Sequence, residues 1–133
     1  MITLSDIQQA RDRLSGVAIR TPLIPLEHGG STLYLKPENL QPVGAFKIRG
    51  AYNKIASLTP EERSRGVIAY SSGNHAQGVA YAARALNSKA VIVMPRVAPA
   101  VKREATEALG AEVVYVGPSG VERMTKAEEL AAK

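Results

Sequence analysis

The sequence predicts an α/β fold: a three-layer αβα arrangement around a parallel β-sheet. Three short apolar runs predict the strands: Val67-Ile68-Ala69-Tyr70, Ala90-Val91-Ile92-Val93 and Val113-Val114-Tyr115-Val116. Continuous apolar runs of this length are typical of parallel strands buried on both faces. The runs begin 23 residues apart, and the intervals hold helical stretches over 74–86 and 99–109. The resulting β-α-β-α-β order places a ligand at the carboxyl ends of the strands.

The residues before these strands predict a helix followed by extended chain. Ser5 and Gln8 form a capping-box pattern, so the first helix is expected to begin at Ser5 and to end at Gly16. Residues 21–25 are expected to be extended, because prolines disfavour helical geometry in the residue before them. A short strand is predicted over 31–36.

Three more helices are expected around the sheet. A helix over 46–58 has an apolar stripe formed by Ile48, Ala51, Tyr52 and Ile55. Another begins at Thr59, where a capping residue, a proline and a glutamate follow the usual order of a helix start. A last helix is predicted over 121–132.

Composition excludes several classes of function. The chain has 17 Lys and Arg against 12 Asp and Glu, and the net charge of +5 is spread thinly along it. With Phe46 as the only phenylalanine, there are few stacking platforms, so no nucleic-acid partner is expected. The absence of cysteine and the presence of only two histidines argue against a metal site. No apolar run of about 18 residues and no signal peptide is found, so we expect a cytoplasmic protein without a membrane partner.

A first candidate for a catalytic segment is Pro42-Val43-Gly44-Ala45-Phe46-Lys47-Ile48-Arg49-Gly50. Lys47 falls in the first turn of a predicted helix, where a cation opposes the helix dipole. The dipole and the nearby charge of Arg49 both favour a neutral amine, which a Schiff-base lysine needs. A solvated lysine at a helix start is the alternative.

The segment Tyr70-Ser71-Ser72-Gly73-Asn74-His75-Ala76-Gln77-Gly78 follows the first strand of the sheet. A helix that begins there would offer free N–H groups to an anion, with Ser71, Ser72 and Asn74 as further partners. Gly78 would let this helix pack closely on the sheet. The alternative is an ordinary helix start that is capped by these same polar side chains.

Taken in order, the two segments resemble the fold-type II pyridoxal-phosphate enzymes, in the branch of threonine ammonia-lyase (threonine dehydratase) and serine racemase. Lys36-Pro37-Glu38-Asn39-Leu40-Gln41-Pro42 and Val93-Met94-Pro95 extend the resemblance over most of the chain. It implies pyridoxal 5'-phosphate as cofactor, a small amino-acid substrate and a homo-oligomer. The implied reaction is the deamination of L-threonine or L-serine to a 2-oxo acid and ammonia.

The resemblance also implies roles for individual residues. Lys47 would be the Schiff-base lysine and proton carrier, Phe46 would pack on the pyridine ring, and Asn74 would bond the phenolic oxygen. The substrate carboxylate would be bound by Ser71, Ser72, Gly73, Asn74 and His75. Ser72 also matches the second base of the racemising relatives.

Enzymes of this family are much longer, and their glycine-rich phosphate loop has no counterpart in this sequence. We therefore expect residues 1–45 to belong to a larger domain and 46–133 to form the small domain, with the cofactor-anchoring half absent. Such a chain alone would bind cofactor weakly and turn over little. A racemase of the same family and a non-catalytic α/β interaction module are the alternatives.

Overall fold

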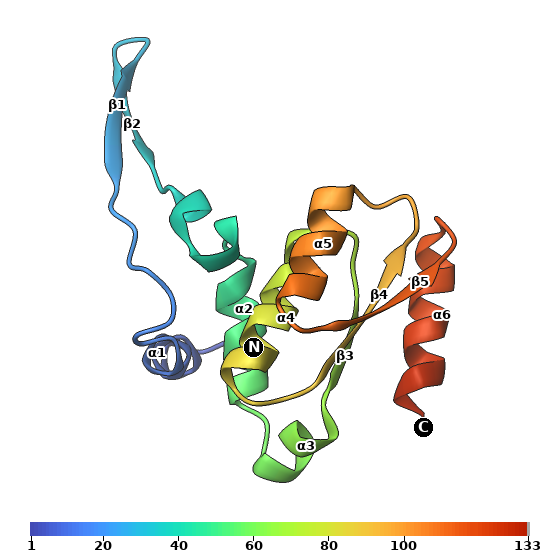
Figure 1. Ribbon diagram of the computed structural model, residues 1–133. Helices are drawn as coiled ribbons and strands as arrows, with labels where there is room; N and C mark the ends of the chain where they lie inside the picture. The colour runs from blue at the N-terminus through green and yellow to red at the C-terminus, as the bar shows by residue number, and fades with distance from the viewer. Residues whose placement is uncertain (133) are drawn as a thin grey trace.

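The computed structural model describes residues 1–132 and consists of a layered α/β body from which a β-hairpin projects (Figure 1). The body contains a parallel sheet with the strand order β3-β4-β5. Its strands are β3 (Val67–Tyr70), β4 (Ala90–Pro95) and β5 (Glu112–Val116). The predicted β-α-β-α-β order is therefore confirmed, with α4 (Asn74–Ala85) and α5 (Ala100–Ala108) as the connecting helices.

Helices cover the sheet on both faces, which confirms the three-layer arrangement. The connecting helices α4 and α5 pack on one face, and α6 (Gly120–Ala131) packs on all three strands from the other (Figure 1). Helix α2 (Lys47–Ala56) packs on α4. The core that joins these layers includes Ile55, Val79, Ile92 and Met94.

Local sequence accounts for two of the helices in the body. Thr59 caps α3 (Pro60–Arg65) in the expected way, and its hydroxyl accepts a hydrogen bond from the N–H of Glu62 at 3.1 Å. Three residues of the predicted stripe of α2, Ile48, Ala51 and Ile55, are buried. Apolar residues at this spacing share one face of a helix, and here that face meets α4.

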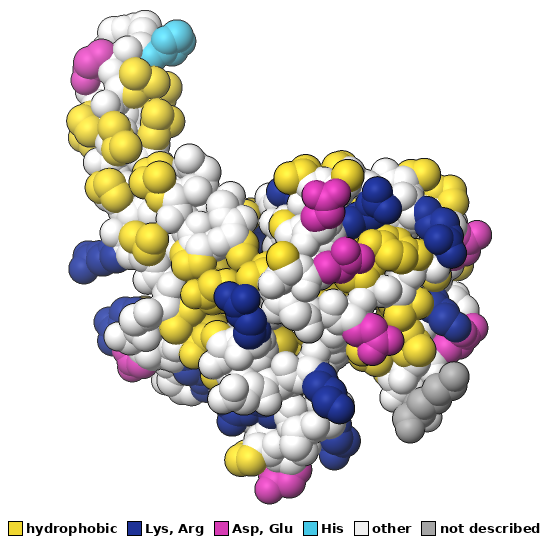
Figure 2. All heavy atoms as spheres, viewed as in Figure 1, with side chains coloured by type: hydrophobic (Ala, Val, Ile, Leu, Met, Phe, Trp, Pro, Cys, Tyr) yellow, Lys and Arg dark blue, Asp and Glu magenta, His cyan; other side chains and the backbone are white. Residues whose placement is uncertain are grey.

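The first 45 residues precede α2 and contribute no strand to the parallel sheet. Helix α1 (Leu4–Arg13) is followed by the antiparallel hairpin of β1 (Ile24–His28) and β2 (Ser31–Leu35), and two single 3₁₀ turns, η1 (Glu38–Leu40) and η2 (Pro42–Gly44), lead into α2. Every residue of the hairpin strands is exposed. Figure 2 shows apolar side chains along this projecting arm.

Two sequence expectations for this region were wrong in detail. Thr3 caps α1, and it exchanges hydrogen bonds with Asp6 in a capping box that was expected at Ser5 and Gln8. Helix α1 ends at Arg13 rather than at Gly16, which lies in the following turn with a positive φ of 75°. A threonine and an aspartate satisfy the free N–H groups as well as a serine and a glutamine do.

Candidate active site

The two sequence motifs meet where α2 packs against α4. Lys47 is the first residue of α2, and Asn74 is the first residue of α4. Gly78 allows the approach, because a Cβ on this residue would lie 3.2 Å from the carbonyl carbon and oxygen of Lys47. The expectation that Gly78 packs on the sheet was wrong: it lies against the first turn of α2. A side chain there would push the two motifs apart.

Lys47 and Phe46 stand together at the surface. The Nζ atom of Lys47 lies 5.0 Å from the centroid of the Phe46 ring, and the ring is 56% exposed. Within residues 1–132 the ammonium of Lys47 is in no salt bridge. The first turn of α2 therefore presents an amine and an aromatic face that no carboxylate occupies.

The charge of Arg49 was expected to act on Lys47, and the structure corrects this expectation. Arg49 donates two hydrogen bonds to Glu38, from Nε at 2.7 Å and from Nη2 at 2.9 Å. The guanidinium beside Glu38, the larger cause, and a hydrogen bond from Thr21 together lower the pKa of this carboxyl to about 2, against the opposing effect of burial. A close ion pair largely neutralises both partners, so Arg49 anchors α2 instead of activating the lysine.

Residues around this ion pair tie α2 to the chain before it. Gln41 binds both backbone groups of Ile19, accepting at 2.9 Å and donating at 2.6 Å. Lys36 donates to the carbonyl of Thr21 at 2.8 Å. Arg49 joins α2 to these residues, because it pairs with Glu38 and also donates from Nη2 to the carbonyl of Ile19 at 3.0 Å.

The loop between β3 and α4 leaves the N-terminus of α4 open. The Ser71 hydroxyl accepts a hydrogen bond from the N–H of Gly73 at 3.3 Å, and no side chain caps α4. The alternative of a helix start capped by these polar side chains is therefore wrong. Ser72 is exposed, and its hydroxyl makes no hydrogen bond within residues 1–132. Uncapped N–H groups at a helix N-terminus are suited to an anion such as a carboxylate or a phosphate.

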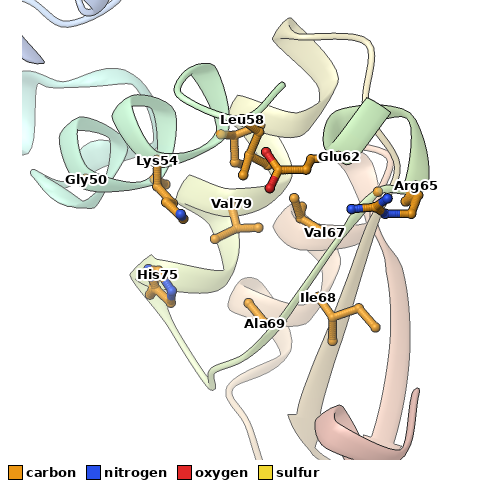
Figure 3. A pocket seen from close by; sticks show the side chains of 13 residues that line it. Gly50, Lys54, Leu58, Glu62, Arg65, Val67, Ile68, Ala69, His75 and Val79 are labelled. Carbon is orange, nitrogen blue, oxygen red and sulfur yellow. The ribbon is translucent and has the colours of Figure 1, made fainter. Parts of the chain in front are cut away.

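His75 lies in the first turn of α4, close enough to Lys47 for the charge of the lysine to act on it. Burial, the larger cause, and the positive charge of Lys47 lower the pKa of the imidazole from its ordinary value of 6.5. His75 also lines a cavity of about 430 Å³ between α2, α3, α4 and β3, which Figure 3 shows together with Lys54 and Val79. Each motif contributes one residue to the lining, Gly50 and His75, whereas Lys47 and Asn74 do not line this cavity.

Lys102 belongs to this site although the sequence interpretation did not select it. It lies in the first turn of α5, and its Nζ donates a hydrogen bond of 2.6 Å to Oδ1 of Asn74. A signal for it was present, since a lysine in a first helical turn opposes the helix dipole as Lys47 does. Two ammonium groups and an uncapped helix N-terminus thus surround the loop after β3.

The matching protein family is described as "Pyridoxal-phosphate dependent enzyme", and the match covers residues 14–133. This chain belongs to that family. The pyridoxal-phosphate-dependent enzymes bind an aldehyde cofactor that also carries a phosphate, a pyridine ring and a phenolic oxygen. The exposed amine of Lys47, the Phe46 ring and the amide of Asn74 match three of these groups chemically.

Individual family members are similar to this chain over nearly all its length. The L-threonine ammonia-lyase of Thermotoga maritima is 55% identical over 121 residues, which are 88% of this chain and 30% of that protein. The catabolic L-threonine dehydratase TdcB of Staphylococcus aureus is 43% identical, over 98% of this chain and 39% of that protein. The structure of maize serine racemase superposes with a TM-score of 0.93 at 37% identity, over 97% of this chain and 40% of that one.

The chain therefore spans well under half the length of the pyridoxal-phosphate enzymes that it matches. Its fold is the one that these enzymes share. No helix within residues 1–132 has the length and apolar character that crossing a membrane requires. In the same residues, no group of three metal-ligating side chains is found.

Proposed function

We propose that this chain is part of a pyridoxal-phosphate-dependent lyase that deaminates L-threonine or L-serine. The observation that carries the proposal is the meeting of the Lys47 segment with the uncapped start of α4. The similarity to the threonine ammonia-lyase of Thermotoga maritima supports this activity over others in the family.

Lys47 holds the cofactor and then moves a proton in this proposal. Its Nζ is the primary amine that would hold the cofactor aldehyde, and the same amine, when free, would accept the proton from the substrate's α-carbon. The cofactor, when bound, withdraws electrons from that carbon. Phe46 would pack against the pyridine ring, and Asn74 would donate a hydrogen bond to the phenolic oxygen.

The loop after β3 orients the substrate. The loop of Ser71, Ser72, Gly73, Asn74 and His75 binds the substrate carboxylate at the positive end of α4. The backbone donors are the N–H groups of Ser72, Asn74 and His75, because the N–H of Ser71 donates to the carbonyl of Val93 at 3.1 Å and that of Gly73 donates to Oγ of Ser71. His75 contributes its backbone N–H to this role, and the lowered pKa of its imidazole keeps that side chain neutral at pH 7. The loop thereby holds the α-carbon of the substrate in reach of Lys47.

The overall reaction balances as a loss of water followed by hydrolysis. The α-proton leaves to Lys47, and the β-hydroxyl leaves with a proton as water. Water then adds back at the α-carbon and releases ammonia, so that threonine or serine gives a 2-oxo acid and ammonia. No external oxidant or reductant is needed.

Racemisation of the same substrates is the second candidate, and Ser72 favours it. Its exposed hydroxyl lies in the substrate loop and has no partner within residues 1–132, so it is available as the second base that a racemase requires. The similarity to maize serine racemase supports this reading as well. Formation of the D-amino acid, measured by chiral chromatography, would separate a racemase from a lyase, which produces a 2-oxo acid.

The division of the chain supports a place within a larger enzyme. We assign residues 1–45 to a larger domain and 46–133 to the small domain. The separate sheets support this division, since the hairpin shares no strand with the parallel sheet. A homo-oligomeric whole protein is part of the same proposal.

Reductive trapping tests the proposal directly. The 133-residue chain is mixed with pyridoxal phosphate, reduced with borohydride and mapped by peptide mass spectrometry. We expect Lys47 to be labelled in preference to Lys54, an exposed lysine of the same helix, and the label to be lost in Lys47→Ala. Equal labelling of both lysines would contradict the assigned site, and a chain that folds without any adduct would favour the non-catalytic module.

A further inference from the structure

The side-chain amide of Asn74 is held by a residue outside both motifs. Lys102, 28 residues further along the chain, donates from Nζ to Oδ1 of Asn74 at 2.6 Å. The two residues follow neighbouring strands, since Asn74 comes after β3 and Lys102 after β4. The hydrogen bond therefore joins two loops at the carboxyl edge of the sheet, where a ligand is expected.

An ammonium group can only donate hydrogen bonds, and this fixes which side of the amide it contacts. With Oδ1 taken by Lys102, the Nδ2 hydrogens are turned away from α5. Within residues 1–132 they donate to no protein acceptor. If the amide turned over, Oδ1 rather than Nδ2 would face the ligand, and an oxygen atom of the ligand would be repelled.

We propose that Lys102 is a positioning residue, which orients the Asn74 amide so that Nδ2 donates to the phenolic oxygen of the cofactor. The inference rests on the proposed function, because it takes the cofactor as the acceptor. Lys102 acts through Asn74 and does not itself hold the cofactor. Its place in the first turn of α5, against the helix dipole, is offset by the hydrogen bond that it makes.

A double-mutant cycle distinguishes orientation of Asn74 from a general effect of charge. The dissociation constant for pyridoxal phosphate is measured by absorbance titration for the wild type, Lys102→Met, Asn74→Ala and the double variant. We expect Lys102→Met to weaken binding about tenfold, as the loss of one oriented hydrogen bond would. In the Asn74→Ala background the same substitution should change binding less than twofold. An equal loss in both backgrounds would overturn the inference, because Lys102 would then act as a charge alone.

A second readout does not need the cofactor. The measurement uses NMR spectra of the ¹⁵N-labelled chain without ligand. The side-chain amide resonance of Asn74 is assigned because it disappears in Asn74→Asp, and its order parameter reports how firmly Oδ1 is held. Lys102→Met should lower the order parameter of this amide, and Lys102→Arg, which keeps a donor, should restore it. Lys89→Met, before β4 at the other end of the strand, is the matched control and should leave the amide unchanged. An Asn74 amide that is equally ordered in Lys102→Met would overturn the inference.

Failure of the proposed function and failure of the positioning role of Lys102 give different results. A wild-type chain whose Asn74 amide depends on Lys102 but in which borohydride labels Lys54 as strongly as Lys47 would contradict the proposed function. A chain that forms the adduct normally, with no coupling between Lys102 and Asn74, would contradict only the positioning role.

Discussion

The charges of individual residues decide which groups at this site are free to act. Glu38 neutralises Arg49, and Asn74 accepts from Lys102, while Lys47 is left without a carboxylate partner in the part of the chain that the structure describes. The positive charge of Lys47 therefore acts mainly on its neighbour His75, whose pKa it helps to lower. In its unprotonated form, an amine without a counter-ion beside a neutral imidazole can accept a proton from carbon.

The coupling between Lys47 and His75 can be measured by titration. In Lys47→Met the positive charge is gone, so the pKa of His75 should rise toward 6.5 but remain below it, because burial is the larger cause of the shift. The midpoint is read from the imidazole resonances in NMR spectra recorded as a function of pH. Lys89→Met should leave the midpoint unchanged. A His75 midpoint that does not move in Lys47→Met would show that the two side chains are farther apart than the structure has them.

The Glu38–Arg49 ion pair predicts how stability depends on pH. The folded chain holds the pKa of Glu38 at about 2, below the ordinary value of 4.5. The stabilisation is therefore complete above pH 4.5 and is lost as the pH falls toward 2. Glu38→Gln should lower the free energy of unfolding by about 2 kcal/mol at pH 7, as expected for a hydrogen bond to a charged group.

Urea unfolding of the wild type and Glu38→Gln at a series of pH values tests this dependence. The difference between the two proteins should shrink as the pH falls from about 5 to 2, because the wild-type carboxyl becomes protonated. Glu128→Gln, which changes an exposed carboxylate of α6, should lower stability by less than about 0.5 kcal/mol. A difference that stays constant with pH would rule out the ion pair as its source.

At the scale of elements, the contact between α2 and α4 brings the two motifs together. Of the two glycines in these helices, Gly78 lies against the backbone of the other helix, and Gly50 does not. In Gly78→Ala the new Cβ would lie 3.2 Å from backbone atoms of Lys47, and backbone gives way less easily than a side-chain end. We expect a loss of about 1–3 kcal/mol in stability and weaker trapping of cofactor at Lys47.

Gly50 offers a matched control within α2. A Cβ there would meet no atom within 4 Å, so Gly50→Ala should stabilise the chain by about 0.5–1 kcal/mol, because alanine favours a helix over glycine. Thermal unfolding and borohydride trapping measure both variants side by side. Equal behaviour of the two alanine variants would contradict the role of Gly78 in the close approach.

Elements with a strong periodic pattern were predictable from the sequence, and contacts between elements were not. The three apolar strands and the stripe on α2 follow from residue spacing alone. The direction in which Gly78 faces, the pairing of Arg49 with Glu38 and the hydrogen bond from Lys102 all depend on residues distant in the chain. The uncapped start of α4 was not predictable either, since the Ser71 hydroxyl accepts from the N–H of Gly73 instead of from an N–H of the helix.

At the scale of the whole molecule, the chain combines a packed body with an arm that has little to pack against. All ten residues of β1 and β2 are exposed, and α1 has no buried residue. Apolar side chains on both strands of the arm reach solvent, among them Leu26 and Leu33, which are paired across the hairpin. A two-stranded hairpin in water is of marginal stability unless another surface covers it.

The exposed arm predicts that this chain associates with copies of itself. Contiguous exposed apolar surface is a site of association, and the charge of +5 is too small to prevent contact at high protein concentration. Light scattering should therefore show the average mass rising with concentration above that of the 14.2 kDa monomer. Leu26→Lys combined with Leu33→Lys places two like charges on the arm and should shift the chain toward the monomer. The paired control Val97→Lys and Val101→Lys alters exposed apolar residues near α5 and should change the mass little. A wild-type chain that stays monomeric at millimolar concentration would contradict the prediction, and an equal effect of both double variants would place the contact elsewhere than on the hairpin.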